Sequence, residues 1–198
     1  MAWDTARTKQ LLLEAAVEEF AEHGPQGARV ARIATRAGVN KERIYQYFGN
    51  KDQLFDAVLE AELANLAAAV PLTAEQAADL GDYVGQVVDY HRAHPHFLRL
   101  LAWEGLQSGG PEHDPVVDES RRARHYAEKV AAISQAQQAG AVTGEVDAAL
   151  LMYAVIALAT AWFTMPQLVR MLLSGTPSED QAAQREALVA LVRRLTAA

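Results

Sequence analysis

Hydrophobic residues are spaced along this chain with the period of α-helices, and no stretch shows the alternation of a β-strand. The first hydrophobic stripe follows the spacing i, i+3, i+4, i+7 and consists of Leu13, Ala16, Val17 and Phe20. Gly24-Pro25 is expected to end this helix, because proline cannot continue the backbone hydrogen-bond ladder. Short helices are predicted at 30–37 and 41–48, and a longer one runs from Lys51 to the residue before Pro71.

Capping residues predict further helices in the middle of the chain. Thr73 and Gln76 have the spacing of a capping box, which indicates the start of a helix. The hydrophobic face of that helix consists of Leu80, Val84, Val87 and His91. Pro95 is expected in the first turn of the next helix, where its missing N–H costs nothing.

Breaks and caps also define the C-terminal helices. Gly109-Gly110-Pro111 interrupts the chain before a long helix that ends at Gly140. Asp147 is expected to cap the following helix. Ser178, with Gln181 three residues on, is expected to cap the last helix. The stripe of that last helix consists of Leu188, Leu191, Val192 and Leu195. The pattern as a whole predicts an all-α protein.

The segment 148–169 contains no charged residue and is long enough to span a bilayer. Alanine, threonine, glutamine and proline dilute its hydrophobicity, and a helix that is apolar all round can equally be buried among other helices. We therefore expect no membrane segment. A homodimer built on residues 148–173 and 178–196 would cover this helix, because two helices from each subunit can form a four-helix bundle.

Residues 30–49 have the spacing of a helix-turn-helix. Ala34 is small where two helices would cross, and Gly38 can adopt the left-handed conformation of a sharp turn. Asn40 is expected to cap the second helix, with Ile44 and Phe48 facing inward. The outer face then consists of Lys41, Glu42, Tyr45 and Gln46. Such a polar helix can enter the major groove of DNA.

The charge distribution supports this interpretation. The net charge of the chain is −7, yet residues 24–51 contain six basic side chains and one acidic side chain. A small basic patch on an acidic body indicates a partner of opposite sign at one place. Tyr45 and Tyr47 lie in this patch. They can be core aromatics, but the surrounding basic residues favour contacts to phosphate.

The stretch "ARVARIATRAGVNKERIYQYFGNKDQLFDAVL" closely resembles the N-terminal domain of the TetR family of transcriptional regulators. The resemblance extends from about Thr8 to Leu59. It implies an N-terminal three-helix DNA-binding domain, residues 1–50, followed by a larger helical domain, residues 51–198. It further implies that the larger domain binds an effector and forms a homodimer through its last two long helices.

The resemblance also implies roles for individual residues. Lys41, Glu42, Arg43 and Gln46 match positions that face bases or the groove, Tyr47 and Lys51 match phosphate contacts, and Tyr45 matches a position used for either. With Asn40, and with Arg29 as a further phosphate contact, these residues are the candidate DNA-binding set.

Three positions depart from the family pattern. Many relatives carry arginine at Ala31, and aspartate is common at Arg32. One step along a helix turns a side chain by about 100°, so Arg32 is not expected to contact bases. Ala28 also replaces a common threonine that would cap this helix.

Large, adaptable side chains in the middle helices indicate a pocket for an apolar or aromatic ligand. The candidate ligand-binding residues are His91, Phe97, Trp103, Tyr126, Tyr153, Trp162 and Met165. Each of them taken singly can equally be a core residue. His91, His94 and His96 could form a metal site with Glu104 or Asp89. We nevertheless expect these histidines to be structural, and we expect no metal or other cofactor.

Several classes of function are disfavoured by what the chain lacks. It contains no cysteine, no phosphate-binding glycine loop and no G-x-S-x-G motif, so we expect no enzyme. The absence of cysteine is compatible with a reducing cytosol, and we expect a cytoplasmic protein. The sequence predicts a ligand-responsive repressor that a small apolar or aromatic molecule releases from a palindromic operator in double-stranded DNA. The alternative is a helical binding module whose basic face is incidental.

Overall fold

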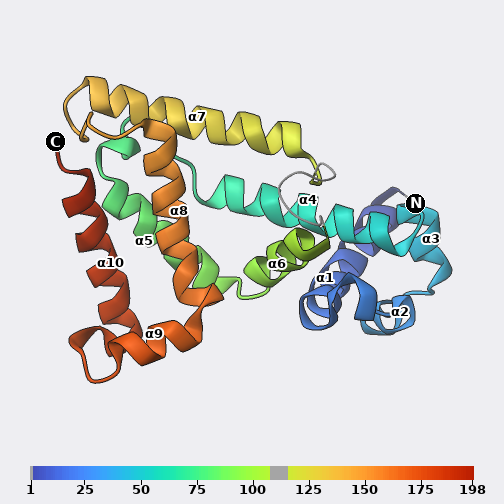
Figure 1. Ribbon diagram of the computed structural model, residues 1–198. Helices are drawn as coiled ribbons and strands as arrows, with labels where there is room; N and C mark the ends of the chain where they lie inside the picture. Colours follow the sequence, from blue (N-terminus) through green and yellow to red (C-terminus); the bar gives the residue numbers. More distant parts are fainter. Residues whose placement is uncertain (1, 108–115) are drawn as a thin grey trace. The chain divides into compact units, whose positions relative to one another are not determined.

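The computed structural model describes residues 2–107 and 116–198, and throughout these ranges the ordered elements are helices (Figure 1). The predicted all-α fold is therefore confirmed. The α-helices are α1 (Ala2–Gly27), α2 (Val30–Ala37), α3 (Glu42–Phe48), α4 (Lys51–Ala69), α5 (Leu80–Ala93), α6 (Phe97–Gln107), α7 (Glu119–Gln138), α8 (Ala148–Thr164), α9 (Pro166–Leu173) and α10 (Gln181–Thr196). The predicted break at Gly109-Gly110-Pro111 lies outside the described residues.

The chain forms two compact units. The N-terminal unit comprises Met1–Asn65 and His96–Glu119, and the C-terminal unit comprises Leu66–Pro95 and Ser120–Ala198. Helix α4 begins in the first unit and ends in the second.

The N-terminal unit has one hydrophobic core to which five helices contribute. Its fully buried large side chains are Leu12, Phe20, Ile33, Ile44, Leu54, Val58, Leu59 and Leu100. Phe20 on α1 packs edge-to-face on Phe55 of α4, with ring centroids 5.1 Å apart. The predicted break in α1 is present, because Gly24 adopts a φ of 66° that interrupts the helical geometry before Pro25. The ring of Trp103 lies against Gly24, about 2.9 Å from where a Cβ would stand, so only glycine fits there.

In the C-terminal unit, α5 is the central helix, and α8 and α10 pack against it (Figure 1). Two ion pairs tie α10 to the α5 region: Arg193 to Asp79 at 2.7 Å and Arg185 to Asp89 at 2.8 Å. Asp147 caps α8 as predicted, since its Oδ1 accepts hydrogen bonds from the backbone N–H groups of Ala149 and Leu150 at 2.9 and 3.1 Å. Helix α7 ends before Gly140, also as predicted.

Three predicted helix starts need correction. Thr73 and Gln76 do form the reciprocal capping bonds, at 2.9 and 3.3 Å, but they cap a 3₁₀ turn (Gln76–Ala78). Helix α5 has its own cap, Asp79. The last helix is capped by Asp180 rather than by Ser178, which lies in a second 3₁₀ turn (Pro177–Glu179). Pro95 precedes α6 instead of opening it. In each case a nearby acidic side chain or turn competes with the simple sequence signal.

The uncharged segment is two helices rather than one. Helix α8 ends at Thr164, and Pro166 is the first residue of α9, because proline lacks an N–H and is tolerated only in the first turn of a helix. The two helices meet at a bend of 88°. Within the described ranges, no single helix is long and apolar enough to cross a membrane, and only this bent pair taken together meets the length and composition.

Candidate nucleic-acid interface and ligand pocket

Helices α2 and α3 form the predicted helix-turn-helix. Gly38 ends α2 in the left-handed conformation, with φ 65° and ψ 29°, and Val39 N donates to Ala34 O at 3.0 Å. Asn40 Oδ1 accepts a long hydrogen bond of 3.4 Å from the backbone N–H of Glu42, the first residue of α3, while Lys41, which directly precedes the helix, makes no side-chain capping bond. The turn is thereby set by one glycine and one asparagine, as the sequence predicts.

The outer face of α3 is polar and exposed. Ile44 is fully buried beneath it, whereas the exposed positions are Asn40, Lys41, Glu42, Arg43, Tyr45 and Gln46. Half of the Tyr45 surface is exposed, which excludes it from the core. Arg43 Nη1 donates to Gln46 Oε1 at 3.0 Å, one turn along the helix. The face therefore carries donors and acceptors suited to base edges.

Tyr47 and Lys51 flank this face. The half-buried Tyr47 ring lies near two cations, with Lys9 Nζ 5.6 Å and Arg43 Cζ 6.0 Å from its centroid. Lys51 Nζ lies 3.4 Å from both the Gln26 and the Ala28 carbonyl oxygens. These acceptors are neutral, and in the part of the chain that the structure describes no carboxylate pairs with Lys51. Its charge is thus positioned but not compensated.

A buried glutamate that the sequence pattern does not predict holds the start of α2. Glu19 of α1 is 1% exposed, and its Oε1 accepts from the backbone N–H of Arg29 at 2.8 Å and from Arg32 Nε at 2.7 Å. Burial raises the pKa of Glu19, but the hydrogen bonds and the charge of Arg32 outweigh this effect, so its pKa is below the ordinary value. Arg32 is therefore used inside the unit, while Arg29 remains exposed.

This contact explains two of the departures from the family pattern. Ala28 cannot cap α2, and Glu19 supplies the missing acceptor from another helix. Arg32 is the partner that makes burial of the Glu19 charge possible. In the sequence, the buried position of Glu19 is indicated only by its place directly beside Phe20, which belongs to the hydrophobic stripe of the first helix.

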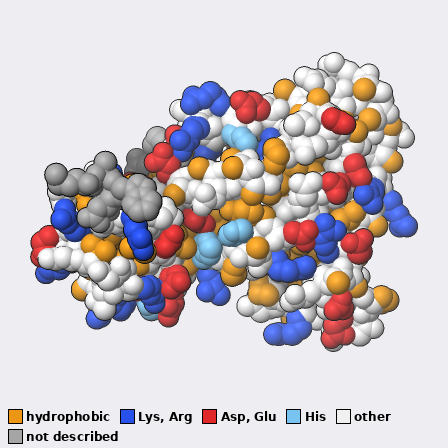
Figure 2. Space-filling model, turned by 180° about the vertical axis from the view of Figure 1, so that it is seen from behind, with side chains coloured by type: hydrophobic (Ala, Val, Ile, Leu, Met, Phe, Trp, Pro, Cys, Tyr) orange, Lys and Arg blue, Asp and Glu red, His pale blue; other side chains and the backbone are white. Residues whose placement is uncertain are grey.

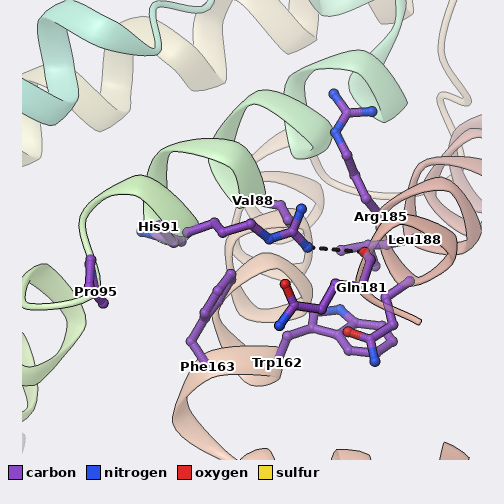
Figure 3. A pocket seen from close by; sticks show the side chains of 10 residues that line it. Val88, His91, Pro95, Trp162, Phe163, Gln181, Arg185 and Leu188 are labelled. Atoms are coloured by element: carbon purple, nitrogen blue, oxygen red, sulfur yellow. Dashed lines mark hydrogen bonds between the residues drawn. The ribbon is translucent and has the colours of Figure 1, made fainter. Parts of the chain in front are cut away.

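The seven predicted ligand-binding residues are not brought together. Phe97 and Trp103 belong to the N-terminal unit, where Phe97 is 1% exposed and Trp103 packs on Gly24. His91 and Trp162 line one hollow in the C-terminal unit (Figure 3). The remaining three are largely exposed and lie outside that hollow: Tyr126, Tyr153 and Met165.

The hollow is small and its charged groups are already engaged. Its volume is about 170 Å³, below the roughly 300–1,000 Å³ of typical ligand sites. Arg185 is bound to Asp89. Gln181 O accepts a hydrogen bond from Arg92 Nη2 at 3.0 Å, which is the dashed line at Gln181 in Figure 3. Burial, with a further contribution from His94, lowers the pKa of His91 to about 4, so this imidazole is neutral at pH 7. A second hollow of about 280 Å³ adjoins Trp162 on the α9 side.

The histidines considered as metal ligands have separate partners. His94 Nδ1 donates to Tyr90 O at 2.9 Å, and its ring stacks on that of Tyr90. His96 Nε2 donates to Glu62 Oε2 at 2.7 Å. Among residues 2–107 and 116–198, no three His, Asp or Glu side chains converge on a point that could hold a metal ion.

The last three helices expose many large hydrophobic side chains. We call this set the α8–α10 surface; it consists of Leu150, Tyr153, Met165, Leu168, Met171, Leu172, Leu191 and Leu195, which are between 42% and 70% exposed. Figure 2 shows hydrophobic side chains reaching the surface of the molecule among charged ones. An apolar set of this size on consecutive helices is typical of a protein–protein contact.

Known families match both ends of the chain. Residues 12–58 match the signature described as "Bacterial regulatory proteins, tetR family", and residues 79–194 match "Tetracyclin repressor-like, C-terminal domain". The chain is 42% identical over 174 residues, 88% of each sequence, to the HTH-type transcriptional repressor SCO4008 of Streptomyces coelicolor. It is 38% identical over 107 residues to the repressor NicS of Pseudomonas putida, which covers 52% of this chain and 50% of NicS.

Solved structures have the same fold. SCO4942 from Streptomyces coelicolor superposes with a TM-score of 0.82 at 31% identity, covering 96% of this chain and 98% of that protein. The ketosteroid transcriptional regulator KstR2 of Mycobacterium tuberculosis superposes with a TM-score of 0.68 at 18% identity, covering 96% of this chain and 95% of KstR2. At that identity the second likeness concerns the fold alone.

Proposed function

This chain belongs to the TetR family of DNA-binding transcriptional regulators, and from this premise we propose that it is a repressor that a small molecule releases from a palindromic operator. Regulators of this family bind DNA and act as dimers. We assign DNA binding to residues 1–50 and effector binding and dimerisation to residues 51–198.

The observation that carries the DNA-binding assignment is the exposed face of α3 beside uncompensated positive charge. We propose that Lys41, Glu42, Arg43 and Gln46 face the major groove, where their polar atoms can reach base edges. The proposed phosphate contacts, which position the helix without reading sequence, are Arg29, Tyr47 and Lys51, with Tyr45 able to serve either role. Asn40 holds the start of α3 through its backbone contact.

Two classes of substitution separate these roles. Lys51→Ala is expected to weaken binding about tenfold on all sequences alike and to lower the salt slope of binding by about one unit, because one counterion-releasing contact is lost. Gln46→Ala is expected to cost about 1–3 kcal/mol on the preferred operator and to relax base preference at one position. Selection of bound DNA in vitro, followed by salt titrations of affinity, measures both effects.

Arg124→Ala is the matched control for charge, because Arg124 is exposed on α7 and lies outside the helix-turn-helix. It should leave the salt slope unchanged. If Lys51→Ala and Gln46→Ala both bound the selected operator as tightly as the unsubstituted protein, α3 would not be the recognition helix.

We further propose that the α8–α10 surface forms the dimer. Its apolar side chains need cover, and both small hollows beside Trp162 are lined by residues of these helices, so a partner subunit would close them. Two recognition helices in such a dimer must lie about 34–36 Å apart to meet successive major grooves. Effector binding in the C-terminal unit would favour a different spacing, and α4 is the helix that connects the two units.

The effector's action follows from linkage. A coupling of about 1–3 kcal/mol weakens operator binding roughly 5- to 150-fold, and operator DNA must weaken effector binding by the same factor. Titration of an effector with and without operator therefore tests the assignment. Equal affinities in the two titrations would show that the compound binds without acting as an inducer.

A further inference from the structure

A buried ammonium group in the C-terminal unit has no acidic partner. Lys129 on α7 is 5% exposed, and its Nζ donates to Val70 O at 2.9 Å and to Tyr83 Oη at 2.8 Å. Nζ also lies 5.0 Å from the centroid of the Tyr83 ring. Among residues 2–107 and 116–198, no carboxylate pairs with it. A buried charge is costly unless it is paired, so this arrangement is incomplete as it stands.

Two hydrogen-bond donors at this place lack acceptors. An ammonium group carries three N–H donors, and the two oxygens account for two of them. The Tyr83 hydroxyl oxygen accepts from Lys129, so its own hydrogen points elsewhere, and no described residue accepts it. Tyr83 is 3% exposed, so bulk water does not readily satisfy this donor.

The pKa shifts of Lys129 and its neighbours are consistent with a positive charge at this place. Burial lowers the pKa of Lys129 to about 8, which leaves roughly nine in ten molecules protonated at pH 7. The pKa of His125, one turn away, is lowered mainly by burial and further by the charge of Lys129. The pKa of Tyr83 is raised mainly by burial and further by the nearby Tyr126. The phenol therefore stays protonated and remains a hydrogen-bond donor.

We propose that Lys129 and Tyr83 form the recognition site for the carboxylate group of the effector, which is therefore an apolar or aromatic carboxylic acid. The proposal rests on the ligand response proposed above and names the chemical class of the ligand. A carboxylate is an acceptor with two oxygens, so it can take the third ammonium hydrogen and the phenolic hydrogen together while it supplies the missing counter-charge.

The helices that carry the two groups also carry buried aliphatic residues, which would suit the apolar remainder of such a molecule. These are Leu80, Val84 and Val87 on α5, and Ala132 and Ile133 on α7. Tyr126, which precedes Lys129 by one turn on α7, is 43% exposed. The Val70 carbonyl that Lys129 holds directly follows α4, so binding here acts on the end of the helix that joins the two units.

The ligand-free protein already offers a check on the buried ammonium group. A lysine whose pKa is lowered on folding binds fewer protons in the folded state between about pH 8 and pH 10.5. Stability contributed by this site must therefore rise with pH across that window. The midpoint of thermal unfolding of the unsubstituted protein, relative to that of Lys129→Met, should increase between pH 8 and pH 10. The comparison cancels the contributions of titratable groups that do not interact with Lys129, because both proteins share them.

The decisive experiment pairs carboxylates with neutral analogues. Benzoate, phenylacetate and octanoate are titrated calorimetrically into the full-length protein, beside benzamide, phenylacetamide and octanamide. We expect at least one carboxylate to bind and its amide to bind at least tenfold more weakly. Lys129→Met should weaken carboxylate binding about 10- to 100-fold, and Tyr83→Phe should weaken it less, because the hydrogen bond from the charged donor is worth more.

The controls and the pH dependence separate recognition from a structural role. Arg124→Met on the same helix and Trp162→Ala in the small hollow should leave carboxylate affinity unchanged. Affinity for the carboxylate should fall as the pH rises above about 8 in the unsubstituted protein and should not do so in Lys129→Met.

Three results would overturn the inference. The acid and its amide could bind equally well, folded Lys129→Met and Tyr83→Phe could bind the carboxylate as tightly as the unsubstituted protein, or every carboxylate could fail to bind. An amide that binds and releases operator DNA would overturn it while leaving the proposed ligand response intact. A carboxylate that binds through Lys129 without changing operator affinity would uphold the site and refute its role as the effector site.

Discussion

Replacing Leu191 by glutamate is expected to convert the proposed dimer into monomers and to lower operator affinity by about 100- to 10,000-fold. Leu191 is 44% exposed on α10, and Leu195 lies one turn further along the same face. A carboxylate in the middle of a paired apolar surface would have to be buried without a partner. Each DNA-binding unit would then meet its half-site separately, so the gain from simultaneous binding would be lost.

Leu106→Glu is the matched control, because Leu106 is a 74% exposed leucine on α6 and lies outside the α8–α10 surface. It should leave both mass and operator affinity unchanged. Light scattering and operator titration on the same samples measure the two effects together. A stable monomer of the unsubstituted protein at micromolar concentration, or a Leu191→Glu protein that remains dimeric, would show that another surface forms the dimer.

Removing the buried carboxylate of Glu19 is expected to destabilise the N-terminal unit by about 2–4 kcal/mol. Glu19→Ala leaves the Arg29 backbone N–H without its acceptor and the Arg32 side chain without its ion pair. The start of α2 is then no longer held to α1, so operator affinity should fall as well, although Glu19 is too deeply buried to touch DNA. Denaturant unfolding and operator titration report the two consequences.

Glu18→Ala is the control of the same chemistry. The Glu18 side chain is 68% exposed and pairs with Arg36 at 3.0 Å, so its loss should cost less than about 1 kcal/mol.

The pKa of Glu19 is lowered in the folded protein, so its contribution to stability is fully present above the unfolded-state pKa and is lost as the pH falls through the folded-state pKa. In Glu19→Gln, the free energy of unfolding should therefore depend less on pH in this acidic range. If Glu18→Ala and Glu19→Ala lowered the free energy of unfolding equally, the buried contacts of Glu19 would contribute no more to stability than an exposed ion pair.

Much of the helix-turn-helix could be derived from the sequence, because the interactions that define it are local. Gly38, Asn40 and the burial of Ile44 act within one or two helical turns, and each was found where the spacing placed it. The same holds for the cap at Asp147 and the helix end at Gly140. The contacts of these residues with DNA remain predictions.

Short-range signals failed where two of them competed. Thr73 with Gln76 and Ser178 with Gln181 both read as helix caps, yet acidic residues closer to the helices took that role. A capping pattern specifies a turn with free N–H groups, and it does not specify whether a long helix or a single 3₁₀ turn follows.

Only the tertiary structure decided which distant groups meet. Glu19 and Arg32 lie on different helices, and Lys129 reaches Tyr83 and Val70 across 46 and 59 residues of chain. Trp103 and Phe97 looked like pocket residues by type, but packing assigned them to the N-terminal unit. Side-chain type and helical period determine which face of a helix is buried, whereas the partner on that face depends on how the helices pack. The sequence therefore determined the helix-turn-helix and the fold class, and the packing of the C-terminal unit decided where an uncompensated buried charge is placed.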